Sequence, residues 1–237
     1  MDVLRSVVNR LRISVSTQQM EALDAYRREL VAASPRAGLT ALRDPEAIER
    51  RHFGESLALL RALEDAGCFG SPAIDIGAGA GFPGLPIKIA RPELRLTLLE
   101  ATGKKIAFLQ RIVDVLRLEG VTVIHGRAEE VAHDPAQRAA YALALARAVA
   151  PLRVLVELAL PFVRVGGALA TPKGSAAPRE AREAAAALAA CGGRIVSMTP
   201  LEPPAGGPAP TLVIVRKVAE TPDRYPRRTG IPSKRPL

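Results

Sequence analysis

Short apolar runs alternate with longer segments of helical periodicity from about residue 72 to residue 217. The apolar runs have the length and composition of buried strands, and we expect strands at residues 73–76, 95–99, 121–125, 142–146, 167–171, 194–198 and 211–216. Apolar residues spaced three and four apart predict helices between them, at residues 84–91, 104–118, 151–164 and 178–190. This alternation predicts an α/β fold in which helices cover both faces of a mostly parallel seven-stranded sheet.

The first 70 residues carry helix signals instead of strand signals. Ser16 and Gln19 form a capping-box pattern ahead of apolar residues that lie on one helix face. Asp44 before Pro45 matches an N-cap followed by proline in the first helical position. A further helix is expected over residues 55–66, because Gly67 is suited to end it. These signals predict an N-terminal helical extension, residues 1–70, ahead of a core at residues 71–217.

The remaining residues, 218–237, form a basic, proline-rich tail. The formal net charge of the chain is +9, which indicates either an anionic partner or arginines spread over every solvated face. The tail favours the first interpretation, because its prolines predict an extended segment that can become ordered on a phosphate backbone. The basic residues that we expect to contact RNA are Arg224, Arg227, Arg228, Lys234 and Arg235.

Composition limits the cellular setting and the cofactors. No uncharged apolar run is long enough to span a bilayer, and the N-terminal residues lack the continuous apolar segment of a signal peptide. Cys68 and Cys191 belong to no CxxC pair and have no neighbouring histidine, so we expect neither a metal site nor a disulfide framework. We expect a cytoplasmic protein without membrane contact.

A glycine-rich loop follows the first predicted strand in the segment AIDIGAGAGFPGLPIKIA, residues 73–90. Residues 79–84 satisfy the GxGxxG pattern of dinucleotide-binding enzymes, and Glu100 lies near the expected position of their ribose-binding acid. Pro83 and Pro86, however, remove two N–H donors that a pyrophosphate would need at the start of the next helix. Asp75 would also place a negative charge close to the phosphates. A nicotinamide cofactor is therefore the second choice.

A cofactor with a cationic end fits this loop better. S-adenosylmethionine carries an ammonium and a sulfonium, which a carboxylate at a strand end attracts. The bare backbone of the loop admits the methionine part closely, and Glu100 can accept hydrogen bonds from both ribose hydroxyls. A tight turn without a ligand, or a basic binding protein with a degenerate cofactor fold, are the remaining alternatives.

Several further motifs carry a family resemblance. The segment DIGAGAGFPGLPIKIARPELRLTLLEATGKKIAFLQ is followed by GRAEE, ARAVAPL, PKG and the ending YPRRTGIPSKRPL. Together they resemble the ribosomal small-subunit methyltransferase G family, also called the glucose-inhibited division protein B family, from about residue 39 to residue 237. The resemblance implies a class I, Rossmann-like methyltransferase that uses S-adenosylmethionine to methylate N7 of a guanine in the decoding region of 16S rRNA. The implied partner is 16S rRNA or the 30S subunit, and we expect a monomer.

The resemblance also implies roles for individual residues. The methionine part of the cofactor would be held by Asp75, Gly77, Gly79, Gly81 and Phe82. Glu100 would hold the ribose, and Ala128 with Glu129 the adenine edge. Arg147 and Lys173 follow the fourth and fifth predicted strands and would position the RNA, with Arg147 also close to the cofactor.

Guanine N7 presents a lone pair and no proton, so its methylation needs no general base, and alignment of the reactants is the main requirement. Other acceptors fit the sequence less well. A pyrimidine carbon-5 enzyme needs a nucleophilic cysteine beside the cofactor. An enzyme that methylates an amino nitrogen often has an Asp- or Asn-Pro-Pro-aromatic turn after the fourth strand, whereas EPPA at residues 202–205 lacks the aromatic residue and comes too late.

Overall fold

The computed structural model describes residues 2–202 and 209–237. In this part of the chain seven strands form a single sheet: β1 Ala73–Ile76, β2 Leu96–Glu100, β3 Val121–His125, β4 Tyr141–Leu145, β5 Val163–Lys173, β6 Gly193–Pro200 and β7 Thr211–Lys217. The helices of the N-terminal half are α1 Asp2–Leu11, α2 Thr17–Ala37, α3 Pro45–Ile48, the π-helix η1 Glu49–Gly54, α4 Glu55–Asp65, α5 Gly84–Ala90 and α6 Gly103–Val115. Those that follow are α7 Ala128–Val131, α8 Leu152–Ala159, the 3-10 helix η2 Leu160–Phe162, α9 Ala177–Glu183, α10 Ala185–Cys191 and α11 Ile231–Lys234.

The strand order is β3-β2-β1-β4-β5-β7-β6. All neighbouring strands are parallel except β7, which runs antiparallel to both β5 and β6. The predicted mostly parallel, seven-stranded sheet is confirmed, and β7 makes it a mixed sheet. The order reverses direction between β1 and β4, and ligands of open α/β sheets bind beyond the carboxyl ends of the strands at such a point.

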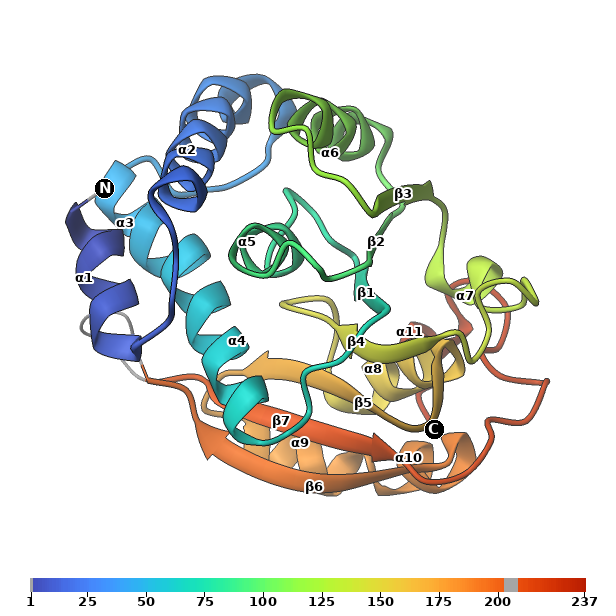
Figure 1. Cartoon of the computed structure of the whole chain (residues 1–237). Coiled ribbons are helices and arrows are strands. Elements are labelled where there is room, and N and C mark those ends of the chain that lie inside the picture. The colour runs from blue at the N-terminus through green and yellow to red at the C-terminus, as the bar shows by residue number, and fades with distance from the viewer. Residues whose placement is uncertain (1, 203–208) are drawn as a thin grey trace.

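Two apolar cores lie on opposite faces of the sheet (Figure 1). The first contains the N-terminal helices together with α5 and α6, and it includes Ala73 of β1. The second contains α8, α9 and α10, and it includes Ile74 and Ile76 of the same strand. Successive residues of a strand point to opposite faces, and this alternation places Asp75 on the side of the first core.

The N-terminal extension differs from its prediction in two details. The capping box of Ser16 and Gln19 begins α2 as expected, and Asp44 caps α3 with Pro45 behind it. The two later helices, however, do not end and restart: α3 continues through η1 directly into α4. Gly54 ends the π-helical turn η1, and the next backbone N–H, that of Glu55, donates to Arg50 O five residues earlier. The helical hydrogen bonds thus continue past this glycine. The extension also begins with α1, a helix that was not predicted.

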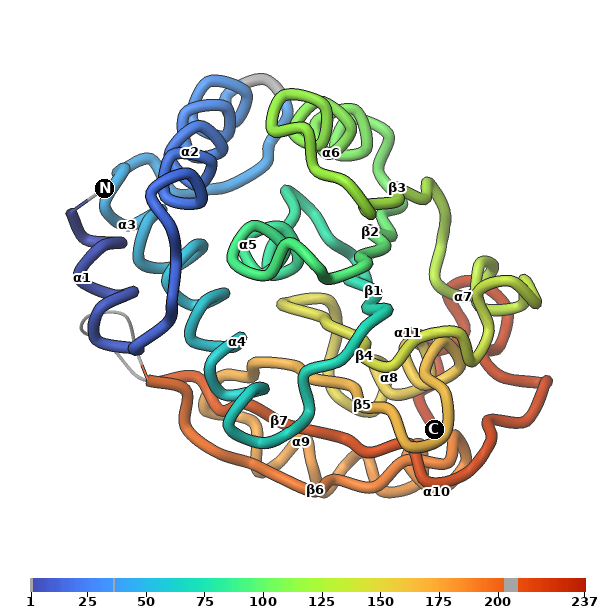
Figure 2. Tube along the Cα trace, in the orientation of Figure 1, coloured from blue at the N-terminus to red at the C-terminus, as the bar shows by residue number. Residues whose placement is uncertain are grey.

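The tail is not a free extended segment, and this part of the prediction is wrong. Residues 218–237 run back along α7 and end beside α8 (Figure 2), with Tyr225 and Pro232 buried. The prolines do not prevent α11, because Pro232 lies in its first turn, where a missing N–H costs no helical bond. The tail is therefore ordered by its packing against the core.

Two smaller boundaries also differ from the prediction. The alanine-rich helix expected at residues 178–190 is divided at Ala184 into α9 and α10. The helix expected at residues 151–164 ends earlier, because Pro161 turns its end into η2 and β5 begins at Val163. Residues 203–205 of the EPPA segment lie outside the described residues.

Candidate active site

Two adjoining cavities lie at the carboxyl end of the sheet, where the strand order reverses. The smaller cavity, about 200 Å³, is lined by residues that follow β1, β2 and β3. The larger cavity, about 640 Å³, is lined by residues that follow β4 and β5 and by part of the N-terminal extension. Val149 and Ala150 line both cavities. The two cavities therefore meet at these residues, and a ligand in one would lie next to a ligand in the other.

The smaller cavity brings together four of the residues predicted to bind the cofactor. These are Gly77, Glu100, Ala128 and Glu129. Ile76, Leu99 and Leu158 add apolar walls, and a mostly apolar pocket with a few fixed polar groups is typical of a small-molecule site.

Backbone N–H groups hold the Glu100 carboxylate in place. Its Oε2 accepts a hydrogen bond from Gly79 N at 2.9 Å, and its Oε1 accepts bonds from Ala101 N at 3.0 Å and Thr102 N at 2.9 Å. These bonds fix the orientation of the carboxylate at the wall of the cavity. An ionised carboxylate has about four acceptor sites, so one remains for a ligand hydroxyl, fewer than the bidentate contact that the sequence had suggested.

Three glycines of the loop, Gly77, Gly79 and Gly81, have a backbone conformation that other residues rarely adopt. Gly77 has φ +66° and Gly79 has φ +61°, in the left-handed region that costs L-residues energy. A Cβ at Gly77 would lie 3.0 Å from Val149 Cγ2, whereas a Cβ at Gly79 would meet only Gly77 O, at 3.8 Å. The space beside Gly79 is thus open, and a side chain there would project into it.

Asp75 lies beneath the glycine loop and is fully buried. Its Oδ2 accepts a hydrogen bond from Gly84 N at 2.8 Å, while its Oδ1 has no partner in the described part of the chain. Burial raises the pKa of Asp75 to about 7, against the opposing effects of the Gly84 bond and of the charge on Arg147. A buried carboxylate oxygen without a partner is costly. Asp75 lines neither cavity. An ammonium such as that of S-adenosylmethionine is the kind of group that would satisfy its Oδ1, and the remaining acceptor site of Glu100 at the cavity wall suits a ribose hydroxyl, so the residues present fit this cofactor.

The raised pKa of Asp75 makes the stability of the cofactor-free protein depend on pH. Because the folded state favours the protonated carboxyl, the stability that it contributes is complete below pH 4 and is lost as pH rises through 7. Asp75→Asn keeps an acceptor for Gly84 N and cannot ionise. At pH 8 we expect the free energy of unfolding of this variant to exceed that of wild type by up to about 4 kcal/mol, and near pH 4 we expect the two values to be equal. Urea denaturation at the two pH values measures this difference. Equal pH profiles for the two proteins would contradict the burial of a charged Asp75.

Gly81 and Phe82, also predicted to contact the cofactor, lie elsewhere. A Cβ at Gly81 would lie 2.4 Å from Leu85 Cδ1 and 2.6 Å from the Tyr26 hydroxyl, so glycine is needed there for packing. Phe82 is buried and stacks on Tyr26 and on His52, with ring centroids 5.2 and 4.8 Å apart. Neither residue lines the smaller cavity, and Phe82 connects the loop to the N-terminal extension instead.

The larger cavity contains both predicted positioning residues, Arg147 and Lys173. Arg147 belongs to the loop after β4, where Ala148 has φ +56°. Strained backbone of this kind persists where the surrounding structure holds it, often at functional sites. The loop residues 147–151 line the larger cavity, and Val149 and Ala150 of this loop also border the smaller one.

The N-terminal extension fixes the guanidinium of Arg147. Its Nη1 donates to Arg51 O at 2.8 Å and lies 3.4 Å from Glu55 Oε2, and its Nη2 lies 3.0 Å from His52 Nδ1. The guanidinium carbon is also 5.4 Å from the centre of the Phe82 ring, within the range of a cation–π interaction. The π-helix η1 presents Arg51 and His52 to this site.

His52 is a functional candidate that the motifs of the sequence did not indicate. Burial, and then the charge on Arg147, lower its pKa to about 4, so the imidazole is neutral at pH 7. Its Nδ1 can then accept from Arg147 while Nε2 donates to Thr40 Oγ1 at 2.7 Å. Nothing in the sequence distinguishes His52 from a surface histidine, because its partner is 95 residues away.

The ammonium group of Lys173, like the guanidinium of Arg147, is fixed by contacts with neighbouring residues. Its Nζ donates to Ala150 O and forms an ion pair with Glu180 Oε2 at 3.0 Å. Glu180 Oε2 also accepts from Leu152 N at 2.8 Å. Lys173 and Glu180 thus tie β5 and α9 to the loop that borders both cavities.

The basic residues of the tail divide into two groups. Arg227 forms an ion pair with the fully buried Glu157, with 2.7 Å between Nη2 and Oε2. The positive charge of Arg227 is therefore paired within the protein. The other four, Arg224, Arg228, Lys234 and Arg235, are exposed. No helix among the described residues could cross a membrane, and no acidic, histidine or cysteine cluster of three or more could hold a metal there.

The strand order and the helices on both faces give the fold of class I methyltransferases. The solved structures that share this fold include a SAM-dependent methyltransferase from Aquifex aeolicus, with a TM-score of 0.54 and 17% identity over 74% of this chain and 94% of that chain. Another is geranyl diphosphate methyltransferase in complex with SAM, with a TM-score of 0.56 and 16% identity over 76% of this chain and 92% of that one. The predicted Rossmann-like methyltransferase fold is confirmed.

The chain belongs to the rRNA small subunit methyltransferase G family, whose model matches residues 19–204. Its relatives include the ribosomal RNA small subunit methyltransferase G of Roseiflexus castenholzii, 47% identical over the full length of both chains. The protein of the same name from Chloroflexus aggregans is 47% identical over 95% of this chain and 93% of that one. The family resemblance, the assignment as an enzyme that methylates ribosomal RNA, and S-adenosylmethionine as cofactor are thereby confirmed.

Proposed function

We propose that the chain transfers a methyl group from S-adenosylmethionine to N7 of a guanine in the decoding region of 16S rRNA. It would act as a monomer on the 30S subunit, in the cytoplasm where that subunit is found. The cofactor would occupy the smaller cavity, and the guanine would enter the larger one.

The observation that carries this proposal is the contact between the two cavities. The smaller cavity presents the carboxylates of Glu100 and Glu129, and the larger one presents Arg147 and Lys173. Because the cavities share Val149 and Ala150, a methyl group at this boundary would be within reach of an acceptor held by the two cations. Cationic side chains suit guanine O6 and the neighbouring phosphates.

The larger cavity offers no free general base in the described part of the chain. Its carboxylates are Glu55 and Glu180, and they face Arg147 and Lys173 respectively, at 3.4 and 3.0 Å. An acceptor that must lose a proton would need a base here, whereas the N7 lone pair of guanine can attack directly. The arrangement therefore favours N7 over an amino or carbon acceptor.

When bound beside Glu100 and Glu129, the cofactor would supply a methyl carbon on a sulfonium; its transfer to N7 would form the N–C bond as the C–S bond breaks, so that the sulfur becomes neutral and the guanine positive. The chain contributes alignment of the two reactants and exclusion of water. Arg147 and Lys173 position the base. Glu55 and Glu180 partly offset their charge, which lowers the repulsion of the positive charge that develops on the guanine.

The reaction is tested by incubating the protein with methyl-labelled S-adenosylmethionine and 30S subunits from a strain that lacks this modification. We expect label in 16S rRNA, and nucleoside digestion should yield labelled 7-methylguanosine. The 50S subunit is the control and should remain unlabelled. Label in any other nucleoside, or only in protein, would contradict the proposed acceptor.

The exposed basic residues of the tail should contribute to RNA affinity. Arg228→Ala and Lys234→Ala each remove one exposed positive charge. For each phosphate that a variant no longer neutralises, we expect the log–log dependence of RNA binding on salt to become shallower by roughly 0.7–0.9. Arg164→Ala removes an exposed charge at the opposite end of β5 and should leave the slope unchanged. An unchanged slope in the tail variants as well would exclude a role of these residues in RNA binding.

A further inference from the structure

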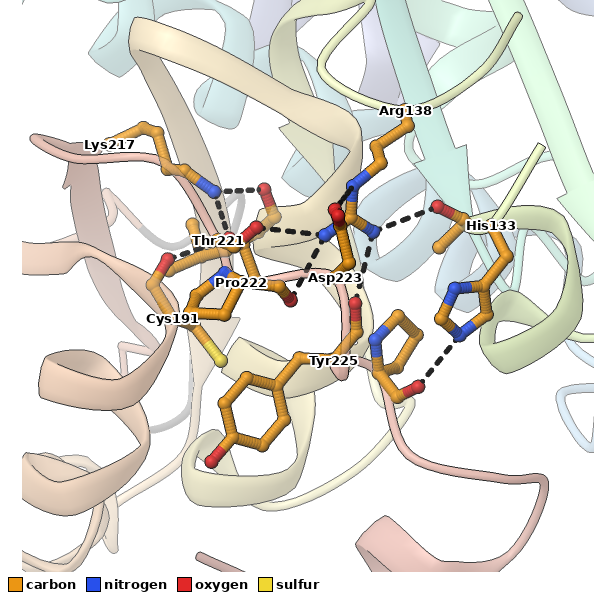
Figure 3. A network of polar contacts seen from close by, with 11 residues as sticks. His133, Arg138, Cys191, Lys217, Thr221, Pro222, Asp223 and Tyr225 are labelled. Atoms are coloured by element: carbon orange, nitrogen blue, oxygen red, sulfur yellow. Dashed lines mark hydrogen bonds and ion pairs between the residues drawn. The ribbon is translucent and has the colours of Figure 1, made fainter. Parts of the chain in front are cut away.

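The C-terminal segment is attached to the core through a cluster of hydrogen bonds around Arg138 (Figure 3). The guanidinium of Arg138 donates to the carbonyls of Thr221, Pro222 and Tyr225 at 2.8, 3.1 and 3.0 Å. His133 Nε2 lies 2.9 Å from the carbonyl of Pro226. Side chains of the core thus capture the backbone of the tail, which determines the path of the residues that follow.

A second attachment lies further along the tail. Arg227 donates to Glu157 through its backbone N at 2.8 Å, through Nε at 2.9 Å and through Nη2 at 2.7 Å. Arg227 Nη2 also donates to Arg235 O at 2.8 Å, and this bond closes residues 227–235 into a loop. Glu157 is fully buried in α8, and no other residue could replace this bidentate geometry without movement of the backbone.

The loop closed by Arg227 borders the smaller cavity. Gly230 N donates to Glu129 Oε1 at 3.0 Å, and Thr229 Oγ1 donates to Glu130 Oε1 at 2.9 Å. Ser233 lines the cavity together with Gly126, Ala128 and Glu129. Gly126, Ala128 and Glu129 follow β3, and β2 with Glu100 lies between β3 and the glycine loop after β1. Ser233 therefore borders the side of the cavity where the adenine would be.

We propose that residues 226–237 form a fixed wall of the cofactor site, that the Arg227–Glu157 ion pair positions this wall, and that Ser233 contacts the adenosine end of the cofactor. This inference rests on the proposed placement of S-adenosylmethionine in the smaller cavity. It assigns Arg227 to cofactor affinity, whereas the exposed cations of the same tail remain directed toward RNA. Arg227 is a positioning residue, because it acts through the loop that it closes.

The test measures the dissociation constant of S-adenosylhomocysteine by calorimetry, with the full chain and without RNA. Arg227→Ala should weaken binding by about tenfold or more, and Arg227→Lys should recover only part of the loss because it cannot form the bidentate pair. Arg164→Ala is the control: it removes one exposed positive charge at the opposite end of β5, outside residues 226–237, and leaves the ion pair intact. We expect its affinity for S-adenosylhomocysteine to equal that of wild type.

Ser233→Phe keeps the proposal testable if Arg227→Ala fails to fold. Ser233 is exposed, so this variant should fold, and its ring should weaken binding of both S-adenosylhomocysteine and 5′-methylthioadenosine, which lacks the amino-acid part. Wild-type affinity in Ser233→Phe, or equal losses in Arg227→Ala and Arg164→Ala, would overturn the proposal. Because no methyl acceptor is present, a wrong assignment of guanine N7 would not affect this result.

Discussion

An Arg147→Ala variant is expected to lose about two orders of magnitude in turnover while it binds S-adenosylhomocysteine as tightly as wild type. Arg147 lines the larger cavity, and its guanidinium is fixed by Arg51, His52 and Glu55. Loss of a group that positions the acceptor misaligns the reacting atoms, and small misplacements cost about 100-fold in rate. The measurement is single-turnover methylation of 30S subunits combined with calorimetry of the cofactor product.

The variant His52→Phe distinguishes two possible roles of His52: positioning Arg147 through its hydrogen bond, and packing on Phe82. Phenylalanine can retain the stack on Phe82 but offers no acceptor for Arg147 Nη2. We expect a smaller loss of turnover, about tenfold, because the other contacts of Arg147 remain. Arg164→Ala, at the opposite end of β5, is the control and should turn over normally. Full activity in Arg147→Ala would refute its role, and full activity in His52→Phe would reduce the histidine to a packing residue.

Gly79→Val is expected to abolish cofactor binding, with a loss of at least about 100-fold in affinity. Gly79 has φ +61°, and the space beside it is open except for Gly77 O at 3.8 Å. The valine side chain would project into this open space, where we propose that the methionine part lies, and its backbone would also be strained there. Calorimetry with S-adenosylmethionine measures the loss directly.

Gly67→Val is the control for backbone strain. Gly67 has φ +60°, and a Cβ there would meet nothing within 4 Å, but this glycine lies at the end of α4, away from both cavities. The two variants should lose similar folding stability, about 1–2 kcal/mol, and differ only in cofactor binding. A folded Gly79→Val that binds as well as wild type would make the loop a turn without a ligand role.

The sequence was sufficient to predict the elements that depend on local patterns. The seven strands have apolar runs of their own, and the loop that follows β1 is evident from its glycines. Glu100 was expected beside the glycine loop because of its spacing from that loop and its place at the end of a strand, and β1 and β2 are indeed adjacent parallel strands whose ends meet at one edge of the sheet. For the same reason Arg147 and Lys173, each after its own strand, were expected at this edge.

Contacts between distant segments could not be predicted in this way. The charge of Arg227 is the same in the sequence whether it faces RNA or the buried Glu157, 70 residues away. Glu157 itself lies within an apolar helix and gives no signal of an ion pair. His52 and Phe82 likewise acquire their roles from the stack that joins the extension to the glycine loop. Such roles depend on the tertiary packing of side chains that local periodicity does not describe.

The most direct test of the proposed reaction is chemical cleavage of 16S rRNA at 7-methylguanosine after treatment of unmodified 30S subunits with the protein and S-adenosylmethionine. Borohydride and aniline cleave the chain at this modified base, and primer extension locates the break. We expect one new stop, at a guanine of the decoding region, that is absent without cofactor and strongly reduced with Arg147→Ala. Methylated RNA that resists this cleavage, or a stop outside the decoding region, would contradict the assignment of guanine N7 as the acceptor.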